Sequence, residues 1–191
     1  MRATTTMIDQ AFGQEARRSW LRDALLVLAG TGLLALSAKV QVPFYPVPMT
    51  MQTLAVLVIG AAFGWRLGAL TILAYLAEGA MGLPVFAGKG AGLGYMMGPT
   101  GGYLVGYVAL AVIAGWAADR GWDRNPLKLG AALTVGSALV LALGWAWLST
   151  LIGAEKAWLG GVAPFVYGDL IKVALVAAAV PAVWSLFGRK A

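Results

Sequence analysis

The sequence contains no cysteine and no histidine. Without these side chains the chain has no disulfide, no thiol nucleophile and no histidine-based triad, and it lacks the ligands of most zinc and haem sites. Charged residues are also scarce, at 12% of 191 residues, while 60% are hydrophobic and the mean hydropathy is +0.79. A soluble domain carries about twice that share of charge. These absences exclude most hydrolase and metalloenzyme chemistry and indicate an integral membrane protein.

Six apolar runs recur along the chain, each near the length of about 20 residues that crosses a bilayer core as a helix. Helices are expected because lipid cannot satisfy open backbone groups. The second and third runs are joined by almost no residues, which predicts a tight antiparallel hairpin. The sequence thus predicts an all-α integral membrane protein with one domain over residues 1–191 and a cytoplasmic surface segment at 1–19. The predicted spans are about 21–40, 49–64, 66–82, 101–118, 127–151 and 164–187.

Basic residues fall unevenly between the connections that these spans create. Ten of the fourteen lysines and arginines lie at the chain ends or in the 2–3 and 4–5 connections: Arg2, Arg17, Arg18, Arg22, Arg66, Arg120, Arg124, Lys128, Arg189 and Lys190. The opposite connections hold Lys39, Lys89 and Lys156. Because cytoplasmic loops are enriched in basic residues, both termini are predicted to be cytoplasmic. Topology therefore explains the net charge of +6 without nucleic-acid binding.

Two opposite charges stand three residues apart in the sixth span, within PFVYGDLIKVALV at 164–176. Asp169 and Lys172 would share one helical face and could neutralise each other for structural reasons alone. Charges at this depth are costly, however, and are usually functional. In the predicted orientation the pair lies toward the outside, as do Glu78 in span 3 and Gln52 in the first turn of span 2. These groups could converge on one outward-facing cavity.

The connection at 82–102 is long, rich in glycine and predicted to lie outside the membrane. Glycine adopts backbone dihedrals that other residues avoid, and long irregular loops commonly act as lids or binding elements. Phe86 and Tyr95 give this loop apolar surface that could dip into the helical bundle. Lys89 is a further candidate contact, although it and Lys39 also suit the membrane interface by default. We therefore expect the loop to cover the cavity.

Two short motifs resemble enzyme signatures but lack the residues that their chemistry needs. GLPVFAGKG at 82–90 departs from a phosphate-binding loop in its glycine spacing and has Gly90 where serine or threonine is required. YGD at 167–169 is similar to a motif of intramembrane aspartyl proteases, which need two aspartates sharing a proton. Asp169 is the only aspartate in the interior of a predicted span. The sequence therefore predicts no enzymatic activity and no cofactor for this chain.

Four motifs resemble a known family in their order and spacing: VPMTMQT at 47–53, GLPVFAG at 82–88, GPTGGYLVGY at 98–107 and GDLIK at 168–172. Together with six predicted spans, they resemble BioY, the biotin-binding S component of energy-coupling factor (ECF) vitamin transporters. The resemblance covers nearly the whole chain from the first span to the sixth. Any one motif would be a weak signal, and the combination of four is specific.

The resemblance implies a multi-pass protein of a bacterial cytoplasmic membrane that captures biotin from outside. It also implies a transmembrane T component and two ABC-type ATPases as partners, so that ATP would act through those subunits and not through this chain. The loop at 82–102 would be the lid, and Asp169 and Lys172 would contact biotin.

The chemistry of biotin agrees with these residues. Asp169 could accept a hydrogen bond from a ureido N–H, and Lys172 could donate to the ureido carbonyl or neutralise the carboxylate. Which end of biotin each residue meets stays open at this point. A largely apolar pocket with a few polar groups is expected for such a ligand. The candidate walls are Phe86, Tyr95 and Tyr167, and Gln52 is a candidate for a further hydrogen bond or for capping span 2.

Three other functions stay open. A self-sufficient secondary transporter could couple uptake to protons through Glu78 and Asp169. An S component of the same fold could bind a different vitamin. The third alternative is an intramembrane enzyme, but the chain has no histidine or cysteine and no second aspartate inside a predicted span. Dependence on partner ATPases would argue against a secondary transporter. Competition by thiamine or riboflavin would indicate a different vitamin, and turnover of a substrate would indicate an enzyme.

Overall fold

The structure is a computed structural model that describes residues 6–12 and 20–188. Five helices in these ranges are long and apolar enough to cross a membrane, and α7 (Ala154–Gly161) leads directly into the last of them. They are α2 (Trp20–Lys39), α3 (Gln52–Ala80), α5 (Gly101–Asp119), α6 (Pro126–Ile152) and α8 (Ala163–Gly188). The prediction of an all-α membrane protein is therefore confirmed.

Four of the six predicted spans match helices α2, α5, α6 and α8 to about one residue at each end. The start of α6 shows why the chain turns helical there. The Asn125 side chain accepts hydrogen bonds from the backbone N–H groups of Leu127 and Lys128, and Pro126 occupies the first helical turn. Asparagine at the cap and proline just inside it are favourable for a helix start. Hydropathy alone thus located these four helices.

The second and third predicted spans together form α3, which turns back on itself at Gly64. Gly64 has φ 78° and ψ 173°, a conformation that side chains disfavour and that glycine adopts readily. Residues 52 and 75 would be about 35 Å apart in a straight helix. Instead, the Gln52 side chain donates a 2.6 Å hydrogen bond to the Tyr75 hydroxyl. The predicted hairpin is therefore confirmed, and the long helices of the described residues form six helical arms.

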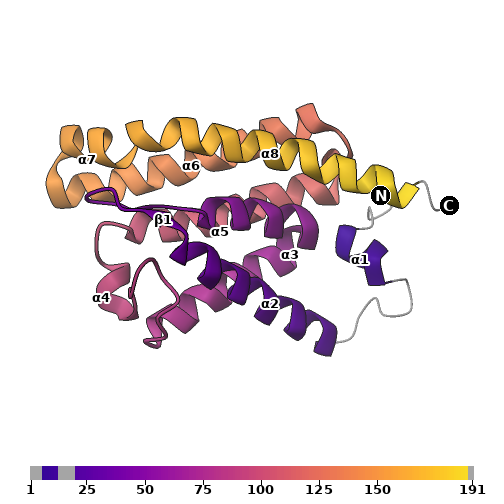
Figure 1. Cartoon of the computed structure of the whole chain (residues 1–191), viewed down its shortest axis with the longest axis horizontal. Coiled ribbons are helices and arrows are strands. Elements are labelled where there is room, and N and C mark those ends of the chain that lie inside the picture. Colours follow the sequence, from indigo (N-terminus) through magenta and orange to yellow (C-terminus); the bar gives the residue numbers. More distant parts are fainter. Residues whose placement is uncertain (1–5, 13–19, 189–191) are drawn as a thin grey trace.

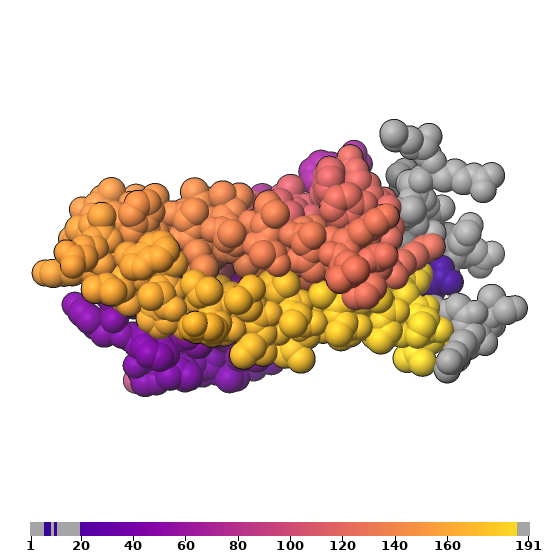
Figure 2. Space-filling view, turned by 90° about the horizontal axis from the view of Figure 1, so that it is seen from above, coloured from indigo at the N-terminus to yellow at the C-terminus, as the bar shows by residue number. Residues whose placement is uncertain are grey.

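Helix α5 lies at the centre of the bundle, between α3 and α6. In the most apolar 18-residue stretch of α5, 67% of the residues are buried, whereas the figure for α2 is 22% and α2 lies at the periphery. Glycines permit this close approach: a Cβ at Gly115 would overlap the backbone of Gly64 and Trp65, and one at Gly106 would press on Val140. Figure 2 shows α6 and α8 lying along the long axis of the molecule, where they contact each other.

Short elements gather at one end of the molecule. Strands β1 (Gln41–Val42) and β2 (Met49–Thr50) pair antiparallel, α4 (Gly92–Met96) lies inside the glycine-rich loop, and α7 lies nearby. Helix α1 (Met7–Phe12) and the C-terminal end of α8 lie at the opposite end (Figure 1). The second predicted span, about 49–64, begins slightly before the helix: residues 49–50 pair with residues 41–42, and α3 starts at Gln52.

The predicted surface segment at 1–19 falls largely outside the described residues. Within it the structure describes residues 6–12, which include α1. The basic residues at positions 2, 17, 18, 189 and 190, on which part of the orientation argument depends, also lie outside the described ranges. The arrangement of the remaining chain still places the loops 41–50 and 82–100 and helix α7 together at one end (Figure 1).

Candidate functional site

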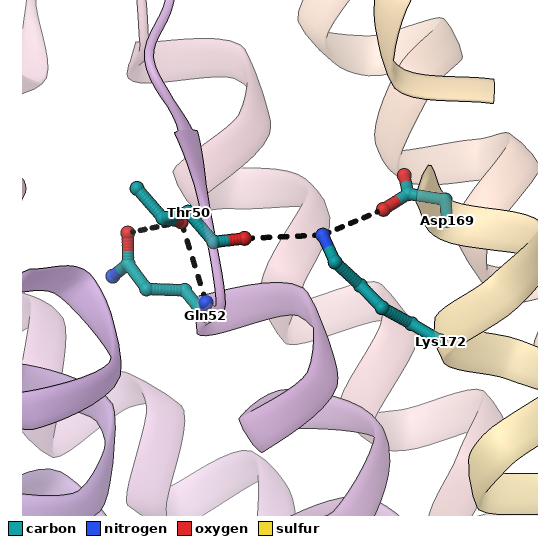
Figure 3. Close-up of polar contacts among 4 residues, drawn as sticks. All are labelled: Thr50, Gln52, Asp169 and Lys172. Carbon is teal, nitrogen blue, oxygen red and sulfur yellow. Dashed lines mark hydrogen bonds and ion pairs between the residues drawn. The ribbon is translucent and has the colours of Figure 1, made fainter. Parts of the chain in front are cut away.

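The two charges of the sixth span form a buried ion pair on α8. Lys172 Nζ lies 3.1 Å from Asp169 Oδ1, and the two residues are 7% and 5% exposed. A spacing of three residues places both on one helical face. The ammonium also donates a 3.0 Å hydrogen bond to the carbonyl oxygen of Thr50 (Figure 3). The pair thus ties α8 to the β2 strand, and removing either charge would leave the other buried without its partner.

A chain of hydrogen bonds continues from Thr50 toward the glycine-rich loop. The Thr50 hydroxyl donates to Gln52 Oε1 at 3.1 Å and accepts from the Gln52 backbone N–H at 3.3 Å (Figure 3). Gln52 Nε2 donates to the Tyr75 hydroxyl at 2.6 Å, and that hydroxyl donates to the Val85 carbonyl at 2.9 Å. Buried polar groups in such a network are costly unless they are satisfied. The network therefore fixes the loop relative to the ion pair.

A cavity opens beside this network, and its empty space measures about 520 Å³ including its open mouth. The lining is mostly apolar and aromatic, with polar groups from α3 and α8. The lining residues are Val47, Pro48, Thr50, Gln52, Thr53, Phe86, Ala87, Tyr95, Thr100, Tyr103, Leu104, Tyr107, Val140, Leu141, Phe165, Asp169 and Lys172. The cavity thus offers a carboxylate acceptor and an ammonium donor within an apolar enclosure.

Aromatic rings form the wall on the side of the glycine-rich loop. The Phe86 ring is fully buried and stacks on Tyr95, with ring centroids 5.1 Å apart and planes at 14°. Tyr75 meets the same ring edge-on at 5.5 Å. Tyr95 lies outside the membrane-spanning segments, and burial raises the pKa of its hydroxyl. The loop therefore contributes an aromatic surface, formed by Phe86 and Tyr95, to the cavity.

The structure brings together five of the eight predicted site residues. Gln52, Phe86, Tyr95, Asp169 and Lys172 all line the cavity. The other three predicted residues, Glu78, Lys89 and Tyr167, are not among its lining residues.

Tyr167 is 77% exposed, and the structure does not place it among the residues that line the cavity. Two positions along a helix correspond to about 200°, so Tyr167 lies on the face of α8 opposite to Asp169. Lys89 is exposed on the loop, and Glu78 is half-buried on α3 away from the lining. Neither residue lines the cavity, and a contact of either with a ligand stays a prediction.

Sequence reasoning missed two tyrosines and the role of one lysine. Tyr103 and Tyr107 from α5 line the cavity, and the Tyr103 hydroxyl donates to the Gly161 carbonyl at 2.7 Å. Both lie in the GPTGGYLVGY motif, four residues apart on one helical face, and that spacing was the available signal. Lys39, expected at the interface, donates to three carbonyls of the glycine-rich loop. Its path to the loop has no sequence signature.

A second, more open hollow adjoins the cavity on its outer side. Its lining comes from the 41–48 connection and the glycine-rich loop, and it shares Pro48, Ala87, Tyr95 and Thr100 with the cavity. The shared residues make it an outer vestibule of the same site. The described residues contain no group of acidic, histidine or cysteine side chains that could hold a metal ion. The geometry suits reversible binding of a small, partly polar molecule.

Comparisons with known proteins agree with this architecture. A family model described as the BioY family matches residues 6–189. The probable biotin transporter BioY of Pyrococcus horikoshii is 37% identical over 153 residues, which are 80% of this chain and 90% of that protein. The biotin transporter BioY of Thermotoga maritima is 36% identical over 155 residues, with the same two shares.

A solved structure shares the fold. The chain superimposes with a TM-score of 0.77 on the crystal structure of an S-component for biotin from an ECF-type ABC transporter, covering 86% of this chain and 92% of that one. The sequence identity of the pair is 22%, so this likeness concerns the fold. The six helical arms and the loops at one end are thus an arrangement that a known membrane protein also adopts.

Proposed function

The chain belongs to the BioY family, and we propose that it captures biotin at the outer face of the membrane as the S component of an ECF-type ABC transporter. Relatives at 36–37% identity that are named biotin transporters support this ligand. The observation that carries the proposal is the buried Asp169–Lys172 pair at the wall of a cavity that is otherwise largely apolar. Biotin combines an apolar ring with a ureido group and a carboxylate, and such a cavity complements it.

The proposed orientation has six membrane crossings, with both ends of the chain in the cytoplasm. It is supported by the bend of α3 at Gly64, which returns the chain to the side from which it came. It is also supported by the basic residues Arg66, Arg120 and Arg124, which lie in the connections at the end opposite to the cavity. In this orientation the cavity and its vestibule face outside, where biotin arrives.

The hydrogen-bonding capacity of the ion pair supports a direct role in binding. Lys172 has three N–H donors, and within the described part of the chain two of them bind Asp169 and the Thr50 carbonyl. The third donor is available to a carbonyl or carboxylate of the ligand. The Asp169 carboxylate accepts from Lys172 through Oδ1, and Oδ2 can accept from a ureido N–H. In the dry part of the cavity these charged hydrogen bonds would orient biotin.

The proposal assigns energy coupling to other subunits. A transmembrane T component and two ABC-type ATPases would use ATP to release biotin into the cell. The fold shared with an S-component of an ECF-type transporter supports this division. Reconstitution with such subunits should make uptake dependent on ATP. Uptake that an uncoupler abolishes while ATP is held constant would instead indicate ion coupling.

The test is equilibrium binding of biotin to the purified chain in detergent, side by side with Asp169→Asn. We expect the variant to bind roughly ten- to a hundredfold more weakly, because a charged hydrogen bond in a buried site is worth about 1.5–3 kcal/mol. Wild-type affinity in the variant would overturn the site assignment. Binding of thiamine or riboflavin, with no binding of biotin, would overturn the identity of the ligand while leaving the cavity as the site.

A further inference from the structure

The end of α2 reaches the glycine-rich loop through one side chain. Lys39 is the last residue of α2, and its Nζ donates to the carbonyl oxygens of Pro84, Phe86 and Gly88 at 2.7, 2.8 and 2.7 Å. A lysine ammonium has three N–H donors, so this arrangement uses all of them. The three carbonyls belong to alternate residues, and their oxygens converge on one point. A compact cation is the group that such a convergence of acceptors suits.

The segment that Lys39 holds, residues 84–88, forms part of the cavity wall. Phe86 and Ala87 line the cavity, and Ala87 and Gly88 line the vestibule outside it. Lys39 itself is exposed and lines neither space. Any effect of Lys39 on a ligand must therefore act through the position of segment 84–88.

Segment 84–88 has little regular structure of its own to keep it in place. Its flanks include Gly82 at φ 95°, and Gly88 has φ 61°, so several backbone conformations are accessible. Its backbone bonds are few: Val85 N–H to Leu83 O, Phe86 N–H to Gly90 O and Gly90 N–H to Ala87 O. External contacts must supply the rest. On one side the Tyr75 hydroxyl donates to the Val85 carbonyl. On the other side Lys39 donates to the carbonyls of the alternate residues 84, 86 and 88.

From these contacts we propose that Lys39 is a positioning residue that fastens segment 84–88 over the cavity and so sets how long a bound ligand stays. This inference rests on the proposed function for the identity of the ligand, but the fastening itself does not. A ligand leaving through the vestibule must pass Ala87 and Tyr95, which belong to both spaces. Loosening segment 84–88 should therefore speed dissociation more than it changes association.

The position of Lys39 also links segment 84–88 to the least buried of the long helices. Helix α2 packs mainly against α3, and only 22% of the residues in its apolar stretch are buried. A shift of α2 along its axis would carry the Lys39 ammonium away from the three carbonyls. Segment 84–88 would then be released without any change in the ion pair on α8.

The first experiment needs no ligand. Amide hydrogen exchange is measured for residues 85–90 in the full chain, for the wild type, Lys39→Met, Lys39→Arg and the control Lys156→Met, which removes an exposed lysine on α7. We expect roughly tenfold faster exchange in Lys39→Met, because charged hydrogen bonds at a partly exposed site are lost. Lys39→Arg should be intermediate, since a planar guanidinium meets converging carbonyls less well than an ammonium. Unchanged exchange in Lys39→Met would overturn the fastening role.

The second experiment measures dissociation and association rates of radiolabelled biotin for the same four proteins. Lys39→Met should release biotin roughly tenfold faster, with an association rate within about twofold of the wild type, and Lys39→Arg should recover part of the loss. Faster exchange with unchanged release would overturn the effect on residence time. If the wild type binds no biotin while Lys39→Met still exchanges faster, the proposed function fails and the fastening role holds.

Discussion

The two ends of the bundle handle charge in opposite ways. At the cavity end, Asp169 and Lys172 are buried against each other, and the Lys39 ammonium is enclosed by loop carbonyls. At the other end, arginines lie over tryptophan rings near the predicted inner boundary of the membrane. The guanidinium carbons lie 3.8–5.2 Å from the ring centroids in the pairs Arg66–Trp65, Arg120–Trp116 and Arg124–Trp184.

This difference separates binding from anchoring. Arginine stacked on tryptophan keeps its charge toward the membrane interface and gains about 0.5–1 kcal/mol at an exposed site. Such pairs agree with a cytoplasmic end rich in basic and aromatic residues. The Asp169 and Lys172 charges are buried and give up water, which costs free energy that a bound ligand can offset. In the proposed orientation, one end of the chain would hold its place in the membrane and the other would meet a ligand.

The largest effect is expected from Lys172→Met at the cavity end, which leaves the Asp169 carboxylate buried without its cation. We expect unfolding in detergent to become easier by about 3–5 kcal/mol, and biotin binding to fall more than Asp169→Asn alone produces. The double variant Asp169→Asn with Lys172→Met removes both charges. It should regain most of the stability and none of the binding. A double variant no more stable than Lys172→Met would show that the ion pair is not the source of the loss.

At the inner end the matching substitution is Gly115→Ala, because a Cβ there would overlap the backbone of Gly64 and Trp65. Backbone cannot move aside easily, so we expect a loss of about 1–3 kcal/mol in stability. Biotin affinity of the folded fraction should stay at the wild-type value. The control is Gly32→Ala on α2, where nothing lies within 4 Å of an added Cβ. Equal stability of the two variants would contradict the close packing of α5 against the bend.

The cavity end has its own glycine test in Gly79→Ala, whose Cβ would overlap the Phe86 ring. A side chain can shift where backbone cannot, so the cost in stability should be smaller than for Gly115→Ala. The shift breaks the stack of Phe86 on Tyr95, and biotin affinity should drop roughly three- to tenfold, the scale of one aromatic pair. Titration calorimetry measures this. Unchanged affinity would remove Phe86 from the binding wall.

The sequence predicted the spans and the ion pair because both are conspicuous against their surroundings. An apolar run of about 20 residues is typical of a membrane span, and charges inside it stand out at once. Gln52, Phe86 and Tyr95 were also found, since they lie in motifs that flank the spans. The turn at Gly64 was predicted from the short connection alone, and the positive φ of that glycine supplies its physical basis.

For other residues the sequence carries too little signal, each for its own physical reason. Tyr167 is close to Asp169 in sequence, but two positions along a helix reverse the face. Tyr103 and Tyr107 lie in an apolar helix, where aromatic residues usually serve packing, so their place at the cavity needed the structure. The role of Lys39 depends on the path of loop carbonyls, and backbone oxygens are the same for every residue type. Contacts made through backbone therefore leave little trace in a sequence.

One carboxylate at the inner end is buried, as Asp169 is at the cavity end. Asp123 is 1% exposed in the short 3₁₀ turn at Trp122–Arg124. Trp184 Nε1 donates to its Oδ2 at 2.5 Å, while Oδ1 has no hydrogen-bond partner among the described residues. Burial raises the pKa of Asp123 above its ordinary value of 3.8, although the Trp184 hydrogen bond and Arg124 act in the opposite direction.

The smallest expected effect follows from Asp123→Asn. A raised folded-state pKa means that the folded chain holds the proton more tightly than the unfolded chain. This contribution is therefore present at acid pH and is lost as the pH rises through the raised pKa. The amide still accepts from Trp184 and carries no charge. At pH 7 the free energy of unfolding of the variant should therefore equal that of the wild type or exceed it by no more than about 1 kcal/mol. The difference in melting temperature should shrink as the pH falls toward 4. A variant clearly less stable than the wild type at pH 7 would mean that the Asp123 charge is used at the inner end, as the charges of the cavity are at the outer one.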